Sequence, residues 1–301
     1  MRRYFLGLLG LGGLAAVALA WLLIPAHLQI RRIEPPLPQH SEILAALAGT
    51  AGPEQLHFIN TASQDIRDEP SMSYPAFLLS WADGRRFMID TGMEREAARS
   101  FGKPLEWLLR AEPMRPYGSV GEQMQAQSIE VQGVALTHMH TDHAGGIRSL
   151  CGLRSSPLPV FQRPLQSTER NHTTEAGRTL ISESGCADFV ELDGGSIAAI
   201  PGFPGIVAVA AAGHTPGSTI YFSRVGEQLW IFAGDITNSR AELEDDIPKQ
   251  FLYSLFIVPE YPERQAALRA WLRDLDAAPE TTVVVSHDLA ALQGSGISSW
   301  R

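Results

Sequence analysis

The chain of 301 residues carries 24 basic and 33 acidic side chains, a formal net charge of −9, and 45% of its residues are hydrophobic. This composition is typical of a folded globular protein and excludes a disordered or collagen-like chain. The net acidity argues against a nucleic acid as partner, because nothing would neutralise its phosphates. Two cysteines are too few for a disulfide-rich scaffold or a cysteine-rich zinc module.

Residues 1–30 have the composition of an export or anchor segment. Arg2 and Arg3 precede 21 uncharged residues, Tyr4 to Ile24, which as a helix would cover about 31 Å, close to the hydrocarbon thickness of a bilayer. Two interpretations remain open: a transmembrane anchor, or a signal peptide cleaved after Ala20. The arginine pair also resembles a twin-arginine export signal. Both interpretations predict an exported protein, which is either membrane-anchored with its folded domain outside the cytoplasm or, after cleavage, periplasmic or secreted.

Residues 31–54 are predicted to be a linker. The Pro-rich stretch 34–39 is typical of a stiff, extended spacer. A short helix is predicted from Ser41 to Ala48, with Ser41 as its N-cap and Gly49 ending it. The remaining residues, 55–301, are assigned to one folded domain.

Short apolar runs separated by Gly, Pro and Asp follow along this domain. Residues 76–81 and 86–89 flank an Asp-Gly pair, which predicts a β-hairpin. Further runs of strand-like length and β-branched content occupy residues 131–136, 206–212, 219–222, 229–233 and 282–285. Helices are predicted over residues 94–99, directly after Asp142, and over residues 263–275, where Pro262 suits a helix start.

Two segments allow two interpretations each. Residues 164–185 are polar and irregular, which indicates a solvated loop by default and a mobile lid as the alternative. Residues 251–258 form an apolar run that either lines a pocket for an acyl chain or forms a buried core segment.

Five of the predicted strands are followed by a side chain that can bind a metal. These side chains are Asp90, His138, His214, Asp235 and His287. One such residue after a strand is usually a turn residue, but five independent cases indicate a shared site. Functional groups of sheet-based folds collect at strand ends, where loops converge.

The densest cluster is His138-Met139-His140-Thr141-Asp142-His143. His138 and His140 are two positions apart, so in extended backbone both side chains point the same way. Asp142 suits a helix N-terminus. Imidazole and carboxylate ligands favour Zn²⁺. Where a larger share of the ligands are oxygen atoms, Fe or Mn is favoured instead. The alternative is a hydrogen-bonded, His-rich loop without a metal.

This cluster matches the HxHxDH signature and resembles the metallo-β-lactamase superfamily. The resemblance extends over roughly residues 55–301 and includes, in the family's order, the segments 89–92, 213–218, 234–235 and 286–288. It implies an α/β fold of four layers, an αββα sandwich, with a dinuclear site along one edge of the sheets. The predicted cofactors are two divalent ions, Zn²⁺ first, with Mn²⁺ or Fe²⁺ as alternatives.

The resemblance also implies a role for each site residue. The first metal would take His138, His140 and His214, the second would take Asp142, His143 and His287, and Asp235 would bridge both. Asp90 would lie beneath the site and orient a histidine ligand. The implied reaction is attack of metal-activated hydroxide on a carbonyl, with Asp142 passing a proton to the leaving group.

The substrate is predicted to be a small molecule. The spacing of Asp235, Pro262 and His287 is most similar to the lactonase branch, whose members open acyl-homoserine lactones. The alternative is hydrolysis of a thioester, as in the glyoxalase II-like branch, or of a phosphoester. A mononuclear iron persulfide dioxygenase of the same fold is a weaker alternative. Lactonases often carry a tyrosine three residues after the bridging aspartate, whereas this chain has Asn238 there. Tyr253 or Tyr261 could replace it, although packing roles are the simpler interpretation.

The remaining histidines and the cysteines carry weaker signals. No ligand spacing surrounds the other histidines, so surface or polar-cluster roles are expected for His27, His40, His57 and His172. Cys151 and Cys186 could form a disulfide in an oxidising compartment, but spacing does not decide the pairing.

Overall fold

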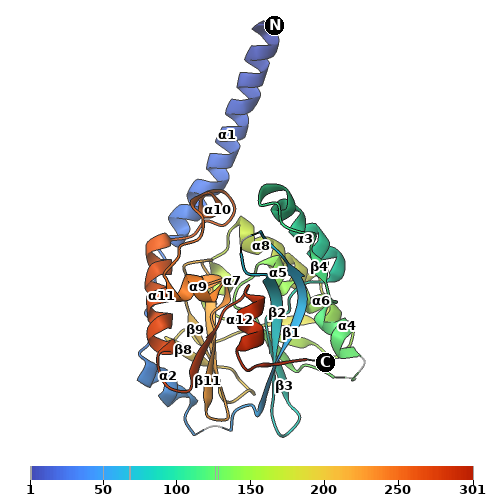
Figure 1. Ribbon diagram of the computed structural model, residues 1–301, viewed down its shortest axis with the longest axis vertical. Coiled ribbons are helices and arrows are strands. Elements are labelled where there is room, and N and C mark those ends of the chain that lie inside the picture. Colours follow the sequence, from blue (N-terminus) through green and yellow to red (C-terminus); the bar gives the residue numbers. More distant parts are fainter. Residues whose placement is uncertain (1, 50, 68, 126, 128, 301) are drawn as a thin grey trace.

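Two β-sheets face each other in the computed structural model, and helices cover their outer faces (Figure 1). The structure describes residues 2–49, 51–67, 69–125, 127 and 129–300. In the N-terminal helix α1 (Arg2–Ile30), side chains are described at residues 13, 14 and 17–30.

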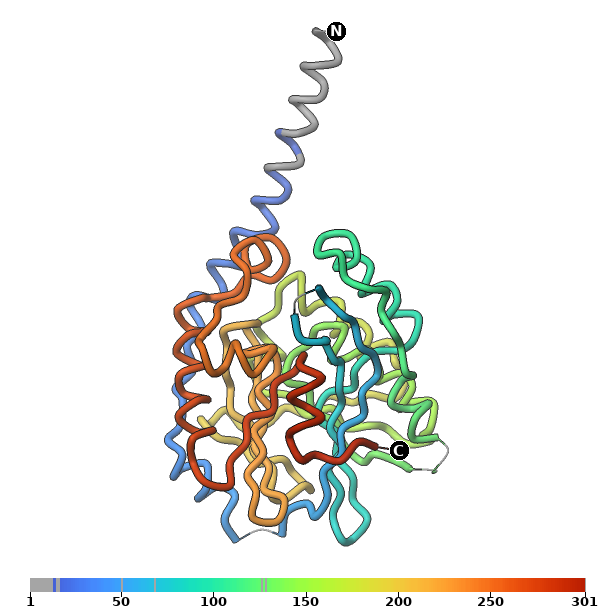
Figure 2. Tube along the Cα trace, viewed as in Figure 1, coloured from blue at the N-terminus to red at the C-terminus, as the bar shows by residue number. Residues whose placement is uncertain are grey.

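The first sheet is mixed and has eight strands. The hairpin β2–β3 lies at its centre, and β5, β6 and β7 follow β3 in parallel. The last strand, β13, returns to the opposite edge and pairs in parallel with β1, which places the C-terminus beside this sheet (Figure 2). The strands are β1 (Gln55–Gln64), β2 (Met72–Ser80), β3 (Arg86–Ile89), β4 (Arg115–Pro116), β5 (Gly133–Ala135), β6 (Leu158–Gln162), β7 (Ala187–Glu191) and β13 (Ser298–Ser299).

The second sheet has five strands in the order β12-β11-β10-β9-β8. All neighbours are antiparallel except β11 and β12, which are parallel. The strands are β8 (Ile197–Ala199), β9 (Ile206–Ala210), β10 (Thr219–Val225), β11 (Gln228–Phe232) and β12 (Thr281–Val284).

The helices connect the strands and pack outside the sheets. They are α2 (His40–Leu47), α3 (Arg95–Leu108), α4 (Val120–Gln125), α5 (Thr141–Ala144), α6 (Ile147–Cys151), α7 (Pro164–Thr168), α8 (His172–Ser182), η1 (Gly234–Ile236), α9 (Arg240–Glu244), α10 (Phe251–Phe256), α11 (Pro262–Asp276) and α12 (Leu289–Gly294).

Three apolar clusters define the four layers. The first lies between the sheets, where Phe77 packs on Phe232 with ring centroids 4.8 Å apart. The second joins α2, α9 and α11 to the outer face of the five-stranded sheet. The third joins α4, α6 and α8 to the outer face of the other sheet. Burial of these apolar faces on both sides of each sheet is the main force that holds the αββα arrangement.

The predicted hairpin, the helix after Pro262 and the later strands are confirmed within a few residues. The helix predicted over residues 94–99 is longer and ends at Leu108. The helix predicted at Ser41 begins earlier: Gln39 is the N-cap, and its N–H donates to the Glu42 carboxylate at 2.6 Å, so Ser41 lies within the first turn.

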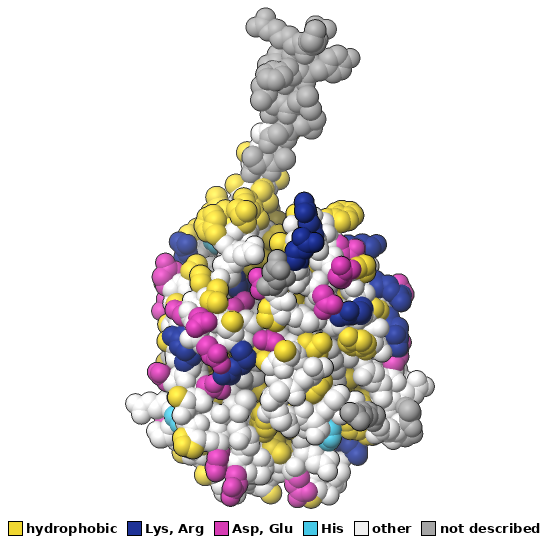
Figure 3. All heavy atoms as spheres, viewed as in Figure 1, with side chains coloured by type: hydrophobic (Ala, Val, Ile, Leu, Met, Phe, Trp, Pro, Cys, Tyr) yellow, Lys and Arg dark blue, Asp and Glu magenta, His cyan; other side chains and the backbone are white. Residues whose placement is uncertain are grey.

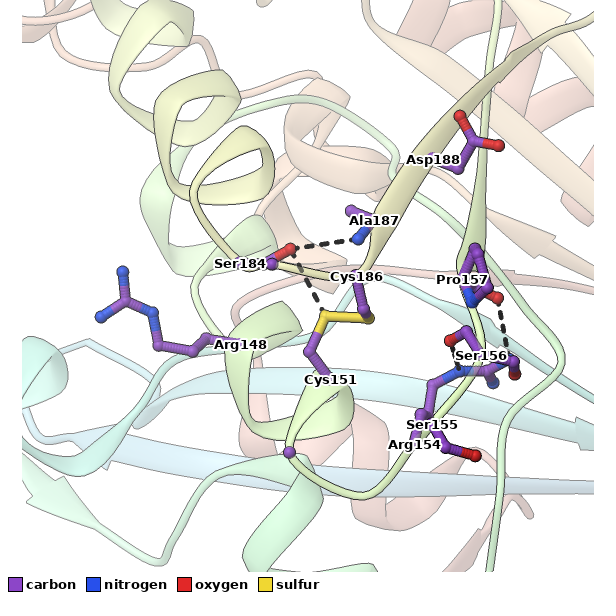
Figure 4. Close-up of a pocket in the computed structure, with 12 residues that line it drawn as sticks. Arg148, Cys151, Arg154, Ser155, Ser156, Pro157, Ser184, Cys186, Ala187 and Asp188 are labelled. Carbon is purple, nitrogen blue, oxygen red and sulfur yellow. Dashed lines mark hydrogen bonds between the residues drawn. A yellow bond between two sulfur atoms is a disulfide. The ribbon is translucent and has the colours of Figure 1, made fainter.

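The prediction of a solvated loop over residues 164–185 is wrong, because this segment contains α7 and α8. The side chain of Asn171 caps α8 by accepting from the Thr173 N–H at 3.0 Å. Directly after α8, Cys151 and Cys186 form a disulfide between the end of α6 and the start of β7 (Figure 4). Nearby, the Ala187 N–H donates to Ser184 Oγ (Figure 4). The disulfide and α8 together fix this segment to the edge of the first sheet.

The N-terminal helix α1 leaves the domain beside α10 (Figure 1). Its last turns are seated on the domain, since Leu23, Ala26 and Ile30 are buried. Over the described residues, no helix has the length and apolar character needed to cross a membrane. The transmembrane segment predicted for residues 1–30 therefore stays a prediction, and much of it lies outside the described side chains.

Candidate metal centre

The five strand-end residues predicted from the sequence converge where the two sheets meet. Asp90 follows β3 and His138 follows β5 in the first sheet. His214, Asp235 and His287 follow β9, β11 and β12 in the second sheet. All five are buried, with exposed fractions between 1% and 5%. The strand ends of both sheets thus deliver one cluster of metal-binding side chains.

Four residues form the first group. The potential ligand atoms of its members lie within 4.8 Å of one another: His138, His140, His214 and Asp235. Nδ1 of His140 lies 3.0 Å from Nε2 of His138 and 3.2 Å from Nε2 of His214. Three imidazole nitrogens therefore face one point, which is the arrangement of a three-histidine metal site.

The second group shares Asp235 with the first. Its ligand atoms also lie within 4.8 Å of one another, and its members are Asp142, His143, Asp235 and His287. Nε2 of His143 and Nε2 of His287 each lie 3.1 Å from Oδ1 of Asp235. The structure thus brings together all seven predicted ligands, with Asp235 positioned between the two groups.

The donor set fits two divalent ions. Nε2 of His143 and Oδ1 of Asp235 are buried and have no hydrogen-bond partner among the described residues. Burial, and then the neighbouring imidazoles, hold the pKa of His138 and of His140 well below the ordinary value. Neutral imidazoles with converging lone pairs are the form that binds a metal.

Asp235 is held as an anion despite its burial. Burial alone would raise the pKa of this carboxyl, but the imidazoles of His287 and His143 lower it well below its usual range. Burial lowers the pKa of those two histidines, but the carboxylates around them outweigh burial, so the pKa of each is raised. Cations in the two groups would replace these protons as the partners of the carboxylate.

Asp90 supports the second group from beneath. It accepts from Nδ1 of His143 at 2.9 Å, which leaves Nε2 of that ring for the metal position. Its carboxylate also accepts from the backbone N–H and the hydroxyl of Thr137, at 2.7 and 2.8 Å. Its backbone has φ of +58°, a conformation that side-chain-bearing residues rarely adopt and that clusters at functional sites. The predicted orienting contact of Asp90 is therefore present.

Gly234 allows Asp235 to reach the centre. Its φ is +56°, and a Cβ built at this position would lie 2.7 Å from Cβ of Thr137. Only glycine accommodates this turn without moving the residue that also contacts Asp90.

A buried ion pair behind His214 escaped the sequence analysis. Glu260 accepts from Nδ1 of His214 at 2.6 Å, and the ammonium of Lys249 lies 3.2 Å from the same carboxylate oxygen. Lys249 also donates to the backbone carbonyl of Asp235 at 2.7 Å. Burial opposes ionisation of Glu260, but the Lys249 ammonium and then His214 lower its pKa to about 2. The pair orients a ligand of each group.

Helix α10 lies above this pair. The Ser254 hydroxyl donates to Oε2 of Glu260 at 2.8 Å, and the Lys249 ammonium lies 5.8 Å from the Tyr253 ring centroid. Burial, and then the carboxylates of the centre, raise the pKa of Tyr253 well above its ordinary value. Of the two tyrosines considered as replacements at the carbonyl, Tyr253 is the one whose ring lies near Lys249, beside the centre. Asn238 keeps a buried Oδ1 without a partner among the described residues.

The other histidines stay outside both groups. Nε2 of His27 lies 3.1 Å from the Leu255 carbonyl, and His57 packs edge-on against Trp300. Burial lowers the pKa of His57 and of His172. Neither these three nor His40 contributes to the two ligand groups found among the described residues.

A family model described as the metallo-beta-lactamase superfamily matches residues 74–287. The chain belongs to the metallo-β-lactamase superfamily. It is a hydrolase of this fold with metal-binding His and Asp residues. A comparison with curated protein sequences finds no match.

Solved structures share the fold at low sequence identity. An N-acyl homoserine lactone hydrolase with the product N-hexanoyl-L-homoserine at its catalytic metal centre is 16% identical; the match covers 81% of this chain and 96% of that one, with a TM-score of 0.59. A B. thuringiensis protein with N-decanoyl-L-homoserine at its active site is 15% identical; the match covers 81% of this chain and 96% of that one, with a TM-score of 0.57. A probable metal-dependent hydrolase from Staphylococcus aureus is 14% identical; the match covers 79% of this chain and 91% of that one, with a TM-score of 0.55. At these identities the likeness shows the fold alone.

Proposed function

We propose that this superfamily member is a dinuclear metal-dependent hydrolase of small carbonyl esters, with an acyl-bearing lactone as the first substrate to test. The observation that carries the proposal is the pair of buried ligand groups that share Asp235. In this assignment His138, His140 and His214 hold the first ion, and Asp142, His143 and His287 hold the second. When bound, two divalent ions supply Lewis acidity and make hydroxide available near neutral pH.

The protein's own residues then position the reactants. Asp90 holds the ring of His143 through Nδ1, and Glu260 does the same for His214, so both imidazoles present Nε2 to the centre. Such partners fix the tautomer and the orientation of a ligand histidine. Because the ligands are buried away from bulk water, charge interactions inside the centre are strengthened.

Asp142 is assigned the proton transfer. It lies in the first turn of α5, and Oδ2 is 3.5 Å from Nε2 of His287 and 3.7 Å from Nε2 of His143. Its carboxylate is therefore beside the second group, where the leaving oxygen of an opened ester would gather charge. A carboxyl in this place can hand a proton to that oxygen.

Two observations support a lactone with an acyl chain. The solved structures that share this fold include one protein with N-hexanoyl-L-homoserine at its catalytic metal centre and one with N-decanoyl-L-homoserine at its active site, which makes this substrate class the natural one to try first. In addition, Tyr253 on α10 lies near Lys249 at the edge of the centre, and its hydroxyl is assigned to hold a substrate carbonyl in place of Asn238.

Export remains part of the proposal. It is supported by the Arg2-Arg3 pair ahead of an uncharged stretch and by the Cys151–Cys186 disulfide, since disulfides persist in oxidising compartments. Fractionation of cells that produce the full chain tests it: recovery in the cytoplasmic fraction with both cysteines reduced would exclude export.

The experiment that tests the function combines metal content with substrate hydrolysis. The full chain is loaded with Zn²⁺ or Mn²⁺, and bound metal is counted by mass spectrometry. We expect two equivalents, falling to one or fewer in Asp235→Ala and staying at two in His172→Gln, whose histidine is outside the site. Proton release is then followed with lactones of increasing acyl length, a thioester and a phosphodiester.

Each outcome decides between the branches. Turnover of lactones that is lost in Asp142→Asn supports the proposal. If only the thioester or only the phosphodiester is hydrolysed, the protein is still a metal-dependent hydrolase, but its substrate class is not the lactones. Fewer than one metal per chain in the unmodified protein would overturn the dinuclear assignment.

A further inference from the structure

Exposed apolar side chains gather at the end of the domain from which α1 leaves (Figure 3). Among the described residues, every exposed large apolar side chain except Tyr117 and Ile247 lies on α1, at the end of α3 or on α10. On the domain itself the most exposed are Trp107 at 83%, Phe251 at 74% and Leu108 at 72%. A concentration of this kind on one face marks a contact surface.

Helix α10 separates this surface from the metal centre. On its inner side, Ser254 bonds to Glu260 and Tyr253 lies over Lys249. Its outer side is apolar and open to solvent, with exposed fractions of 46% to 74% at Phe251, Leu252 and Phe256. The apolar surface therefore begins one helix thickness above the candidate site.

The surface continues onto α1. Nε2 of His27 lies 3.1 Å from the Leu255 carbonyl of α10, and the Gln29 amide donates to Glu169 after α7 at 2.9 Å. The opposite side of the same turns is exposed and apolar at Trp21, Leu22, Ile24 and Leu28. Contacts thus hold α1 and α10 as neighbours that present one apolar surface.

We propose that this end of the domain docks on a lipid bilayer, with α10, the end of α3 and the exposed side of α1 at the acyl boundary. Three observations favour lipid over a protein partner. The surface is built from three separate segments, and two of them carry an exposed tryptophan, Trp21 and Trp107, the residue that membrane interfaces enrich. The 21-residue uncharged stretch of the sequence leads into the same surface.

Charge at the border of the surface agrees with this occupant. Arg31 and Arg32 follow α1, and Arg110 follows Leu109 at the end of α3; all three basic residues are exposed. The chain as a whole is acidic, so basic residues at the border of one apolar surface are a local feature. Such residues attract the anionic headgroups that surround an inserted apolar surface.

Docking in this orientation brings α10 to the lipid, and on its inner side Ser254 of this helix bonds to Glu260, the partner of His214. A substrate with an acyl chain could then enter past α10 from the bilayer without crossing water. This consequence for the substrate depends on the proposed hydrolase function, whereas the docking itself does not.

The test uses the full chain with one labelled cysteine, because both native cysteines are in the disulfide. Leu252→Cys on α10 carries an environment-sensitive nitrobenzoxadiazole dye. The matched control is Glu227→Cys, an exposed position in the turn between β10 and β11, at the opposite end of the domain (Figure 1). Vesicles of phosphatidylglycerol and phosphatidylethanolamine that contain a lipid-borne quencher are added.

We expect a blue shift and quenching for the dye at position 252 and neither for the dye at position 227. Replacing one exposed aromatic side chain, Phe256→Ser, should lower the docking constant about tenfold. That variant should hydrolyse a water-soluble lactone at the unmodified rate, which separates failure of docking from failure of the proposed function.

Three results would overturn the proposal. The first is that both dyes report water in the presence of vesicles, which means that the protein does not dock. The second is that both dyes report lipid, which means that the protein inserts without a preferred orientation. A shift at position 252 that depends on protein concentration and needs no vesicles would instead assign the surface to a second copy of the chain.

Discussion

Replacing Glu260 by Gln removes the negative charge that holds both His214 and Lys249. Glu260 is buried at 4% exposure, and its pKa of about 2 lies below the ordinary value of 4.5. A difference of this size corresponds to about 3 kcal/mol of stability at neutral pH. The same magnitude, about 3 to 5 kcal/mol, is expected for breaking a buried ion pair and leaving the Lys249 ammonium without its partner.

The pH dependence of this loss has a definite sign. Because the folded-state pKa is lowered, the contribution of Glu260 is fully present above about pH 4.5 and is lost as the pH falls through about 2. The difference in the free energy of unfolding between the unmodified protein and Glu260→Gln should therefore shrink from about 3 kcal/mol at pH 7 to about 1.4 kcal/mol at pH 3. Urea unfolding of chelator-treated protein at several pH values measures it.

Glu242 provides a control of opposite sign. Burial raises the pKa of this carboxyl, although Lys249 and a hydrogen bond from the Asn238 N–H at 2.7 Å oppose the shift. As the pH rises from the ordinary pKa through the raised folded-state pKa, the free energy of unfolding of the unmodified protein therefore falls. Over that range Glu242→Gln should become more stable relative to the unmodified protein.

The ion-pair assignment for Glu260 has a clear refuting result. A decrease in the free energy of unfolding below 1 kcal/mol in Glu260→Gln, or a decrease that is the same at pH 3 and pH 7, would refute it.

Three further predictions concern single contacts. In preparations that hold two metals, Asp142→Asn should lower kcat by about 10²- to 10⁴-fold; unchanged kcat in such protein would remove its proton role. Asp90→Asn should weaken metal binding by about 10- to 100-fold in a competition titration with a chelating dye, and equal affinity would mean that the His143 contact is structural only. Replacing Cys151 and Cys186 by Ala opens a loop with a sequence separation of 35 and should cost about 4 kcal/mol in urea unfolding; a loss below 1 kcal/mol would contradict the cross-link.

The candidate ligands could be found from the sequence because each follows a short apolar run. A strand end fixes where a side chain emerges, so five strands with Asp or His after them predict a meeting point before any fold is known. The motif around His138 supplies four ligands within six residues. The structure brings the seven candidate ligands together in two groups that share Asp235.

The partners of the ligands had no comparable signal. Lys249 and Glu260 are ordinary charged residues eleven positions apart, and their meeting behind His214 depends on how α10 is placed. The start of α8 was detectable, since Asn171 is a good N-cap, but the polar composition of residues 164–185 favoured a loop. The pairing of Cys151 with Cys186 required the positions of α6 and β7.

The apolar run at residues 251–258 shows why composition alone misplaces such segments. Apolar side chains indicate removal from water, and the sequence offered two protein environments for them, a core or an acyl pocket. The structure gives neither for the outer side of α10: no residue of this helix is buried, and only Val258 beyond it enters the core. A lipid surface satisfies the same apolar pattern as a protein core. What distinguishes the two is whether the rest of the chain covers the helix, and here the described chain covers only the side that faces Glu260 and Lys249.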